Sequence, residues 1–157
     1  MPEEQHEVKP VESNVEIITR NPVAVGIILD PMERILLQKK DGGYLWHPNK
    51  WGFPGGAIEQ GENPKEAYLR EVAEELGAEL EDVQLFGTYG FRDHDETRNK
   101  IRSYQAHVFS GRFDGDLSKL RIIEGNGMAL LTRHEIDDHP LAWCNKRVIV
   151  DFYDSLL

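Results

Sequence analysis

The chain has 157 residues and a single cysteine, Cys144, so it cannot form an internal disulfide. Its longest apolar run, Val23–Leu29, has seven residues, whereas a membrane-spanning helix needs roughly 18–20. The first twelve residues, MPEEQHEVKPVE, lack the basic and apolar blocks of a secretory signal. These absences predict a soluble, cytoplasmic protein that does not enter a membrane.

Basic residues are also scarce, because 18 Lys and Arg stand against 28 Asp and Glu, a net charge of −10. A protein that binds duplex nucleic acid needs a positively charged footprint, so this class is disfavoured. The same charge would repel an anionic phosphate substrate unless bound cations and a few placed basic residues neutralised it locally. An enzyme that acts on phosphates with this composition is therefore expected to use metal ions.

The length fits one domain with a sizeable core. Residues 1–13 are polar and charged and are expected to form a flexible lead-in, which leaves 14–157 as a single domain. The apolar and turn patterns predict strands at Val15–Thr19, Val23–Leu29, Arg34–Lys40, Val83–Arg92, Lys100–Phe113 and Met128–Leu131, and a closing helix at about 140–155. The continuous apolar run Val23–Leu29 predicts a strand that is buried on both faces. Arg34–Lys40 is expected to be its hairpin partner. Strands interleaved with helices predict an α/β fold, a mixed sheet between helices.

A further helix is predicted at roughly 64–76, and both of its ends carry signals. Asn63 is a good N-cap, and Pro64 suits the first helical position, where its missing N–H would have no partner. Glu66 is placed to reach back to the backbone amide of the cap. Gly77 supplies the left-handed residue that ends the helix.

Two arcs of this helix have different characters. At about 100° per residue, the arc expected to face the core carries Leu69, Val72, Ala73 and Leu76. Glu71, Glu74 and Glu75 share another arc at spacings i, i+3 and i+4, so their carboxylates are neighbours that repel one another. A divalent cation would turn that repulsion into binding, since hard ions take carboxylate oxygens. Glutamates alone are equally typical of a solvated helix face, so the surrounding residues decide.

The surrounding residues fit the pattern G-x5-E-x7-R-E-U-x-E-E-x-G-U, in which U is aliphatic. Its fixed positions are filled by Gly56, Glu62, Arg70, Glu71, Glu74, Glu75 and Gly77. Val72 takes the first aliphatic position, while Ala78 is smaller than the usual residue at the last. The chain thus closely resembles the Nudix hydrolases, and in character the mutator-type nucleoside triphosphate pyrophosphohydrolases. The resemblance implies the α/β/α sandwich of that family, with a mixed sheet between helices, over most of the chain.

The resemblance also implies an activity, the metal-dependent hydrolysis of a phosphoanhydride in a nucleoside diphosphate linked to another group. It makes Glu71, Glu74 and Glu75 ligands of Mg²⁺, or of Mn²⁺, together with a carbonyl from the Gly55–Gly56 turn. Arg70 is expected to orient a glutamate, with Glu62 acting structurally through it. The metal would neutralise phosphate charge and lower the pKa of the attacking water.

A further acid is expected from a loop. In mutator-type members a glutamate followed by glycine precedes the last strand, and Glu124 in RIIEGNG is similar in character and position. Glu124 is therefore a candidate ligand or base, with Asp93, Asp95 and Glu96 as rivals because other members draw an acid from that loop. Either Glu71 or Glu124 could accept the proton of the water.

The substrate is left open by these residues. Lys39 and Lys40 are candidates for phosphate contacts, and Asn145 falls where mutator-type members place an asparagine that reads the base. The first hypothesis is a nucleoside triphosphate cleaved to monophosphate and pyrophosphate. The alternatives are ADP-ribose or another nucleotide sugar, a dinucleoside polyphosphate, or a catalytically inactive nucleotide sensor. The resemblance is compatible with a homodimer.

Overall fold

The computed structural model describes residues 4–5, 15–39, 49–95, 97–121, 127–141 and 143–157. Its strands are β1 (Glu4–Gln5), β2 (Glu16–Thr19), β3 (Val23–Leu29), β4 (Ile35–Lys39), β5 (Trp51–Gly52), β6 (Gly55–Ala57), β7 (Glu81–Asp95), β8 (Lys100–Arg112) and β9 (Met128–Leu131). Its helices are α1 (Pro64–Leu76), the short 3₁₀ helix η1 (Leu117–Lys119), α2 (Arg133–Asp137) and α3 (Trp143–Ser155). The lead-in predicted over residues 1–13 lies outside the described residues, except for β1, which pairs with β7.

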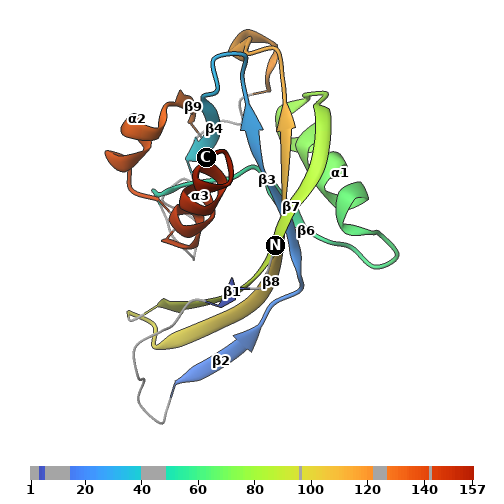
Figure 1. Ribbon diagram of the computed structural model, residues 1–157. Helices are drawn as coiled ribbons and strands as arrows, with labels where there is room; N and C mark the ends of the chain where they lie inside the picture. The colour runs from blue at the N-terminus through green and yellow to red at the C-terminus, as the bar shows by residue number, and fades with distance from the viewer. Residues whose placement is uncertain (1–3, 6–14, 40–48, 96, 122–126, 142) are drawn as a thin grey trace.

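The sheet is mixed, and β3 lies near its centre. β3 runs parallel to β8 and antiparallel to β6, while β7 pairs antiparallel with β8. Helix α1 covers one face of the sheet, and α2 and α3 lie on the opposite side (Figure 1). The predicted α/β/α sandwich with a mixed sheet is confirmed.

Strand β3 is buried on both faces, as its unbroken apolar sequence predicts. Val23, Ile27 and Leu29 pack into a cluster with α2 and α3. Ala24 and Ile28 pack into a second cluster with α1. Because consecutive strand residues point to opposite faces, one apolar strand fastens both helical layers to the sheet.

The hairpin prediction for β3 and β4 is confirmed, because the two strands pair antiparallel, but their pairing is short. Only Leu29 and Ile35 pair between these strands, whereas β4 pairs antiparallel with β9 along Ile35–Gln38 and with β5 at Gln38 and Lys39. The sequence did not predict α2, which begins with a capping box between Thr132 and Glu135. The pairing of β4 with β9 joins segments about ninety residues apart, which local patterns do not encode.

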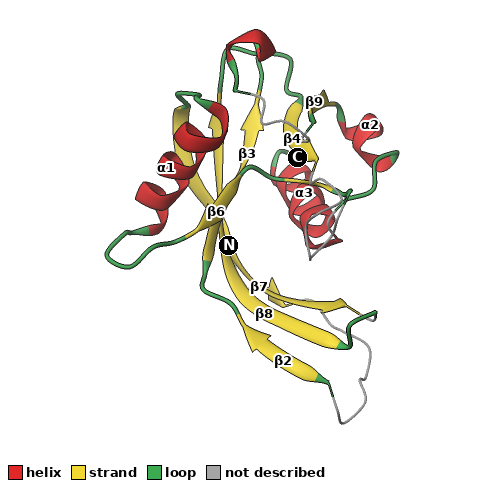
Figure 2. Cartoon of the chain, turned by 180° about the vertical axis from the view of Figure 1, so that it is seen from behind, coloured by secondary structure: helices red, strands yellow, loops and turns green. Residues whose placement is uncertain are grey.

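Strands β7 and β8 continue past the body of the molecule as a long hairpin, and β2 pairs parallel with β8 there (Figure 2). Inside this arm, Arg102 donates to Asp93 at 2.7 Å, and its guanidinium lies 4.9 Å from the centre of the Tyr104 ring. The Tyr104 hydroxyl donates to the same carboxylate at 3.3 Å. Asp93 is fully buried, so the arm contains a closed ion pair.

Helix α1 begins and ends as the sequence predicts. The Asn63 side chain accepts a hydrogen bond from the amide of Glu66 at 2.9 Å, and Gly77 has a φ of 65°. The Glu66 carboxylate differs from the prediction, because it contacts the side-chain amide of Asn63 rather than its backbone. The N-terminal boundary is therefore set by the cap and by Pro64.

The predicted core face of α1 was partly wrong. Leu69 is 41% exposed and Ala73 is exposed, whereas Ala67 and Tyr68 are fully buried beside Val72 and Leu76. The reason lies in β3. A Cβ at Gly26 would come within 2.1 Å of the Tyr68 hydroxyl, so the strand leaves room for a large ring, and the helix turns Tyr68 into it.

Candidate active site

Arg70 is the hub of the charged edge of α1. Its Nε and Nη2 donate to the two carboxylate oxygens of Glu62 at 2.7 and 2.9 Å. Its Nη1 donates to Glu71 at 2.9 Å and to Glu74 at 3.3 Å, and Nη2 also donates to the carbonyl of Ala57 at 3.1 Å. Bidentate bonding to Arg70 lowers the pKa of Glu62. One guanidinium therefore joins the loop before α1, strand β6 and two of the helix glutamates.

Glu71 lies directly against the glycine turn. Gly56 pairs with Ala24 of β3, and a Cβ on Gly56 would stand 2.6 Å from the Glu71 carboxylate carbon. Such contacts are far inside van der Waals separation, so a side chain here would push the carboxylate away. The absence of a side chain at Gly56 lets the strand backbone and the carboxylate share one small space.

Glu75, unlike Glu74, is partly buried, and it lies beside the glycine turn. The amide of Gly55 donates to its Oε2 at 3.4 Å, and the side chain of Gln38 also bonds to it. Burial, together with the charge and hydrogen bonding of Glu71, raises the pKa of Glu75 to about 7 against the pull of those two donors. Two neighbouring carboxylates are the kind of oxygen donor set that suits a hard divalent cation.

Glu74, the third predicted ligand, lies apart from this pair. Its side chain is 62% exposed and bonds to Arg70. Within the residues that the structure describes, no three His, Cys, Asp or Glu side chains are close enough together to hold a metal ion. The described donor set is thus the Glu71 and Glu75 pair beside the Gly55–Gly56 backbone.

Several predicted site residues lie outside the described part of the chain, namely Lys40, Glu96 and Glu124. The two ends of the segment that carries Glu124 are nevertheless fixed. Arg121 donates from its backbone to Leu76 at 2.7 Å and from its side chain to the carbonyl of Glu74 at 3.0 Å. Gly127 accepts from the amide of Lys39 at 2.8 Å. Arg121 therefore lies against the end of α1, and Gly127 lies against β4.

The two rival acids that the structure describes are placed elsewhere. Asp93 is engaged by Arg102 inside the arm, and Asp95 bonds to Arg98 at the tip of the hairpin, where it pairs with Lys100. The arm extends away from α1 (Figure 2). In the structure Asp93 and Asp95 thus have arginine partners within the arm, and the hypothesis that one of them supplies the additional acid stays a prediction.

Asn145 and Lys39 lie on elements that neighbour the glycine turn. The side-chain oxygen of Asn145, on α3, accepts from the amide of Phe53 at 3.4 Å and lies against Gly52. Asn145 thus supports the segment that leads into Gly55. Lys39 is exposed at the end of β4. Sequence reasoning missed Gln38, whose only signal was its place just before two lysines.

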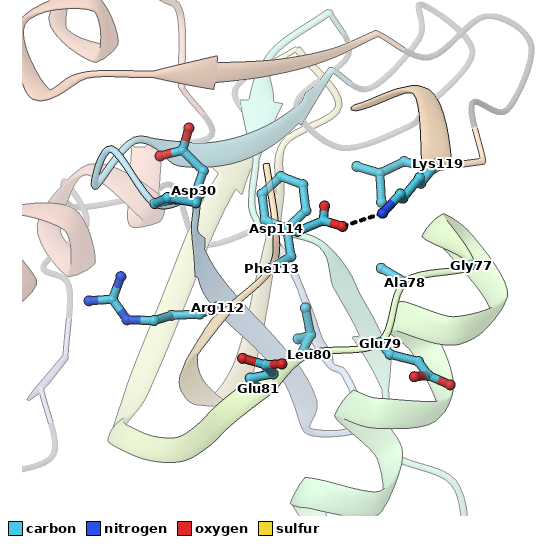
Figure 3. A pocket seen from close by; sticks show the side chains of 12 residues that line it. Asp30, Gly77, Ala78, Glu79, Leu80, Glu81, Arg112, Phe113, Asp114 and Lys119 are labelled. Carbon is cyan, nitrogen blue, oxygen red and sulfur yellow. Dashed lines mark hydrogen bonds and ion pairs between the residues drawn. The ribbon is translucent and has the colours of Figure 1, made fainter. Parts of the chain in front are cut away.

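A cavity of about 590 Å³ opens at the C-terminal end of α1 (Figure 3). Its lining includes Asp114 and Lys119, which form an ion pair at 2.6 Å, and Arg112, which bonds to Glu33 at 2.8 Å. Neither Glu71 nor Glu75 is among its lining residues. This cavity is separate from the glutamate pair, and its basic side chains already have partners.

Comparison with known proteins decides the family, since the model of the NUDIX domain matches residues 19–152. The chain belongs to the NUDIX family. The match confirms the resemblance carried by the residues from Gly56 to Ala78. Among the residues that the structure describes, no helix is long and apolar enough to cross a membrane.

Curated relatives of this NUDIX chain include two enzymes that are named for different activities. An RNA pyrophosphohydrolase from Hydrogenovibrio crunogenus is 32% identical over 87 residues, which are 52% of this chain and 53% of the relative. A prenyl-diphosphate phosphatase from Methanosarcina mazei is 31% identical over 94 residues, which are 60% of this chain and 51% of the relative. The chain thus spans about half the length of these relatives.

Solved structures share the NUDIX fold at low identity. The dihydroneopterin triphosphate pyrophosphohydrolase of E. coli superposes with a TM-score of 0.69 at 18% identity, covering 87% of this chain and 97% of that one. A MutT protein from Methanosarcina mazei Go1 gives 0.66 at 20% identity, covering 92% and 97%. At these identities the likeness shows the fold alone.

Proposed function

We propose that this NUDIX protein is a metal-dependent pyrophosphohydrolase that cleaves a nucleoside triphosphate to a monophosphate and pyrophosphate. One observation carries the proposal, the pairing of Glu71 and Glu75 against the glycine turn. The family match supports hydrolysis of a phosphoanhydride, and the carboxylate pair supports the use of Mg²⁺, or of Mn²⁺.

The chain's own residues have distinct parts in this reaction. Glu71 and Glu75 would hold the cation with a carbonyl of the Gly55–Gly56 turn, and Glu74 would join them by turning away from Arg70. The bound metal would lower the pKa of a water molecule and screen the phosphates. Arg70 orients Glu71 by a charge-assisted bond. Either Glu71 or Glu124 would accept the proton of the water.

The triphosphate hypothesis has support from the names of related proteins. The E. coli neighbour is a triphosphate pyrophosphohydrolase, and the Hydrogenovibrio relative is an RNA pyrophosphohydrolase. The alternative, ADP-ribose or another nucleotide sugar or a dinucleoside polyphosphate, has support from a NUDIX domain of Shewanella oneidensis NrtR crystallised with ADP ribose, at a TM-score of 0.63 and 16% identity. Lys39, Lys40 and Asn145 remain the predicted substrate contacts in either case.

A substrate panel separates these possibilities. Purified protein with Mg²⁺ is offered nucleoside triphosphates, ADP-ribose, a dinucleoside polyphosphate and a 5′-triphosphorylated oligonucleotide, and the products are identified. Pyrophosphate with a monophosphate from free triphosphates is expected, and activity should disappear with EDTA and return with Mg²⁺ or Mn²⁺. Turnover of ADP-ribose alone would support the alternative, and turnover in excess EDTA would contradict the metal-dependent chemistry.

We also propose that the protein is cytoplasmic and forms a homodimer. The net charge of −10 supports a protein that avoids duplex nucleic acid. Light scattering at micromolar concentration distinguishes a dimer from a monomer.

A further inference from the structure

Tyr68 carries a buried hydroxyl that packing does not explain. The residue is fully buried, and its ring stacks on Phe109 with centroids 5.1 Å apart. The hydroxyl has no hydrogen-bond partner among the residues that the structure describes. A phenylalanine would fill the same space without burying a polar group, and an unmade buried hydrogen bond is destabilising.

The hydroxyl lies over the strand that supports the glycine turn. It sits directly above Gly26, whose lack of a Cβ makes room for it. The amide of Gly26 donates to the carbonyl of Pro54 at 3.1 Å. The N–H of that same peptide group, on Gly55, donates to Glu75. Gly26 is therefore one peptide group away from the Glu75 carboxylate.

Electrostatics also link Tyr68 to Glu75. Burial raises the pKa of the Tyr68 hydroxyl, and the negative charge of Glu75 raises it further. The hydroxyl therefore stays protonated and remains a donor. Glu75 is the acid near Tyr68 that has room for another donor, because its described bonds are to the Gly55 amide, Gln38 and the competing Glu71.

Resting on the proposed function, we propose that Tyr68 is a positioning residue for Glu75. When the cation is bound, the Tyr68 hydroxyl donates to the Glu75 carboxylate, directly or through one buried water molecule, and holds it in the orientation that binds the cation. The buried hydroxyl destabilises the metal-free protein, but it is kept because its hydrogen bond to Glu75 is used when the metal ion is bound. Activity and stability therefore oppose each other at this position.

The test replaces Tyr68 by phenylalanine and uses Tyr153 as a matched control. The Tyr153 hydroxyl is also shielded from solvent without a hydrogen-bond partner among the described residues, but it lies on α3, on the other side of the sheet. Tyr68→Phe and Tyr153→Phe therefore remove the same chemical group. Only the first change removes a donor beside Glu75.

Three measurements are made on each variant, namely thermal unfolding in EDTA, Mn²⁺ affinity from the electron paramagnetic resonance of free Mn²⁺, and kcat and KM. Tyr68→Phe should unfold at the same or a higher temperature than wild type, yet bind Mn²⁺ about 10-fold more weakly and lose kcat to a similar extent with little change in KM. Tyr153→Phe should keep wild-type Mn²⁺ affinity and kcat.

A double-mutant cycle with Glu75→Gln asks whether the effect passes through Glu75. In the Glu75→Gln background, Tyr68→Phe should no longer weaken Mn²⁺ binding. Wild-type Mn²⁺ affinity in Tyr68→Phe, or an undiminished loss in the Glu75→Gln background, would overturn the role of Tyr68 and leave the proposed function standing. A wild-type protein that binds no Mn²⁺ would instead overturn the proposed function, and this inference with it.

Discussion

Two arginine–carboxylate clusters in this molecule differ in their balance of charge. In the arm, the guanidinium of Arg102 donates to the fully buried carboxylate of Asp93, which also accepts from the Tyr104 hydroxyl. On α1, the single guanidinium of Arg70 lies within ion-pair distance of four carboxylates, those of Glu59, Glu62, Glu71 and Glu74. Glu75 adds a further acid beside Glu71.

The difference in charge balance distinguishes a cluster that stabilises the fold from a cluster that we propose to bind a metal ion. A buried pair with matched charges is complete by itself, and losing one member leaves an uncompensated charge. In a partly exposed cluster with surplus negative charge the carboxylates repel each other, which supports our proposal that a cation binds there. The excess of acid over base around Arg70 therefore lies at the proposed site, whereas the buried ion pair of Asp93 and Arg102 belongs to the scaffold.

The largest effect is expected in the arm. Arg102→Met should destabilise the fold by about 3–5 kcal/mol, because Asp93 would keep its buried charge without the guanidinium. Arg112→Met is the control, since the exposed pair of Arg112 with Glu33 should contribute less than about 1 kcal/mol. Urea unfolding measures both. If both variants lost the same small amount of unfolding free energy, the buried pair of Arg102 and Asp93 would not be the stabilising cluster that we describe.

The next effect is on turnover. Glu75→Gln removes a ligand charge at nearly constant volume and should lower kcat about 100-fold or more while the fold stays intact. Asp95→Asn, in the arm, should leave kcat unchanged because Asp95 bonds to Arg98 away from α1. Steady-state kinetics with Mg²⁺ and circular dichroism measure the two properties. Near-normal turnover in Glu75→Gln would reject the metal-binding role of the α1 cluster.

A moderate effect is expected from pH. Because the pKa of Glu75 is raised from its ordinary 4.5 to about 7, a proton competes with the cation below pH 7. Mn²⁺ affinity should fall about 10-fold per pH unit there, as one proton must leave for each ion bound. Calorimetric titrations between pH 5.5 and 8 measure this, and a flat profile would contradict it.

The same pKa shift affects stability without metal. Between pH 4.5 and about 7 the folded chain binds more protons than the unfolded chain, so the contribution of Glu75 is present at low pH. It is lost as the pH rises through 7. Glu75→Gln should remove this part of the pH dependence of unfolding in EDTA.

The smallest effect is expected at the cap of the helix that carries the site. Asn63→Ala should destabilise the protein by about 1 kcal/mol, because the amide of Glu66 loses its acceptor. Lys65→Ala, an exposed change in the same turn, serves as the control and should have little effect. Thermal unfolding measures both. A large loss of kcat at full stability in Asn63→Ala would show that the cap belongs to the site.

Local patterns predicted much of the fold, and they failed where distant segments meet. The cap at Asn63, the stop at Gly77 and the two-faced burial of β3 follow from residue types within a few positions of each other. The pairing of β4 with β9 does not, because it is set by packing across the sheet. The exposure of Leu69 could likewise not be predicted from the sequence, since it depends on the room that Gly26 leaves for Tyr68.

By itself the sequence determined the family, the helix and the identity of the acids, because a spacing of three and four residues places glutamates on one helical edge whatever surrounds them. Only the tertiary structure decided how those acids are used. In the folded chain, Glu71 and Glu75 lie against the glycine turn, and Glu74 bonds to Arg70. Asp93 lies in the arm, where it bonds to Arg102. Burial and charge at a point in space depend on every segment that meets there.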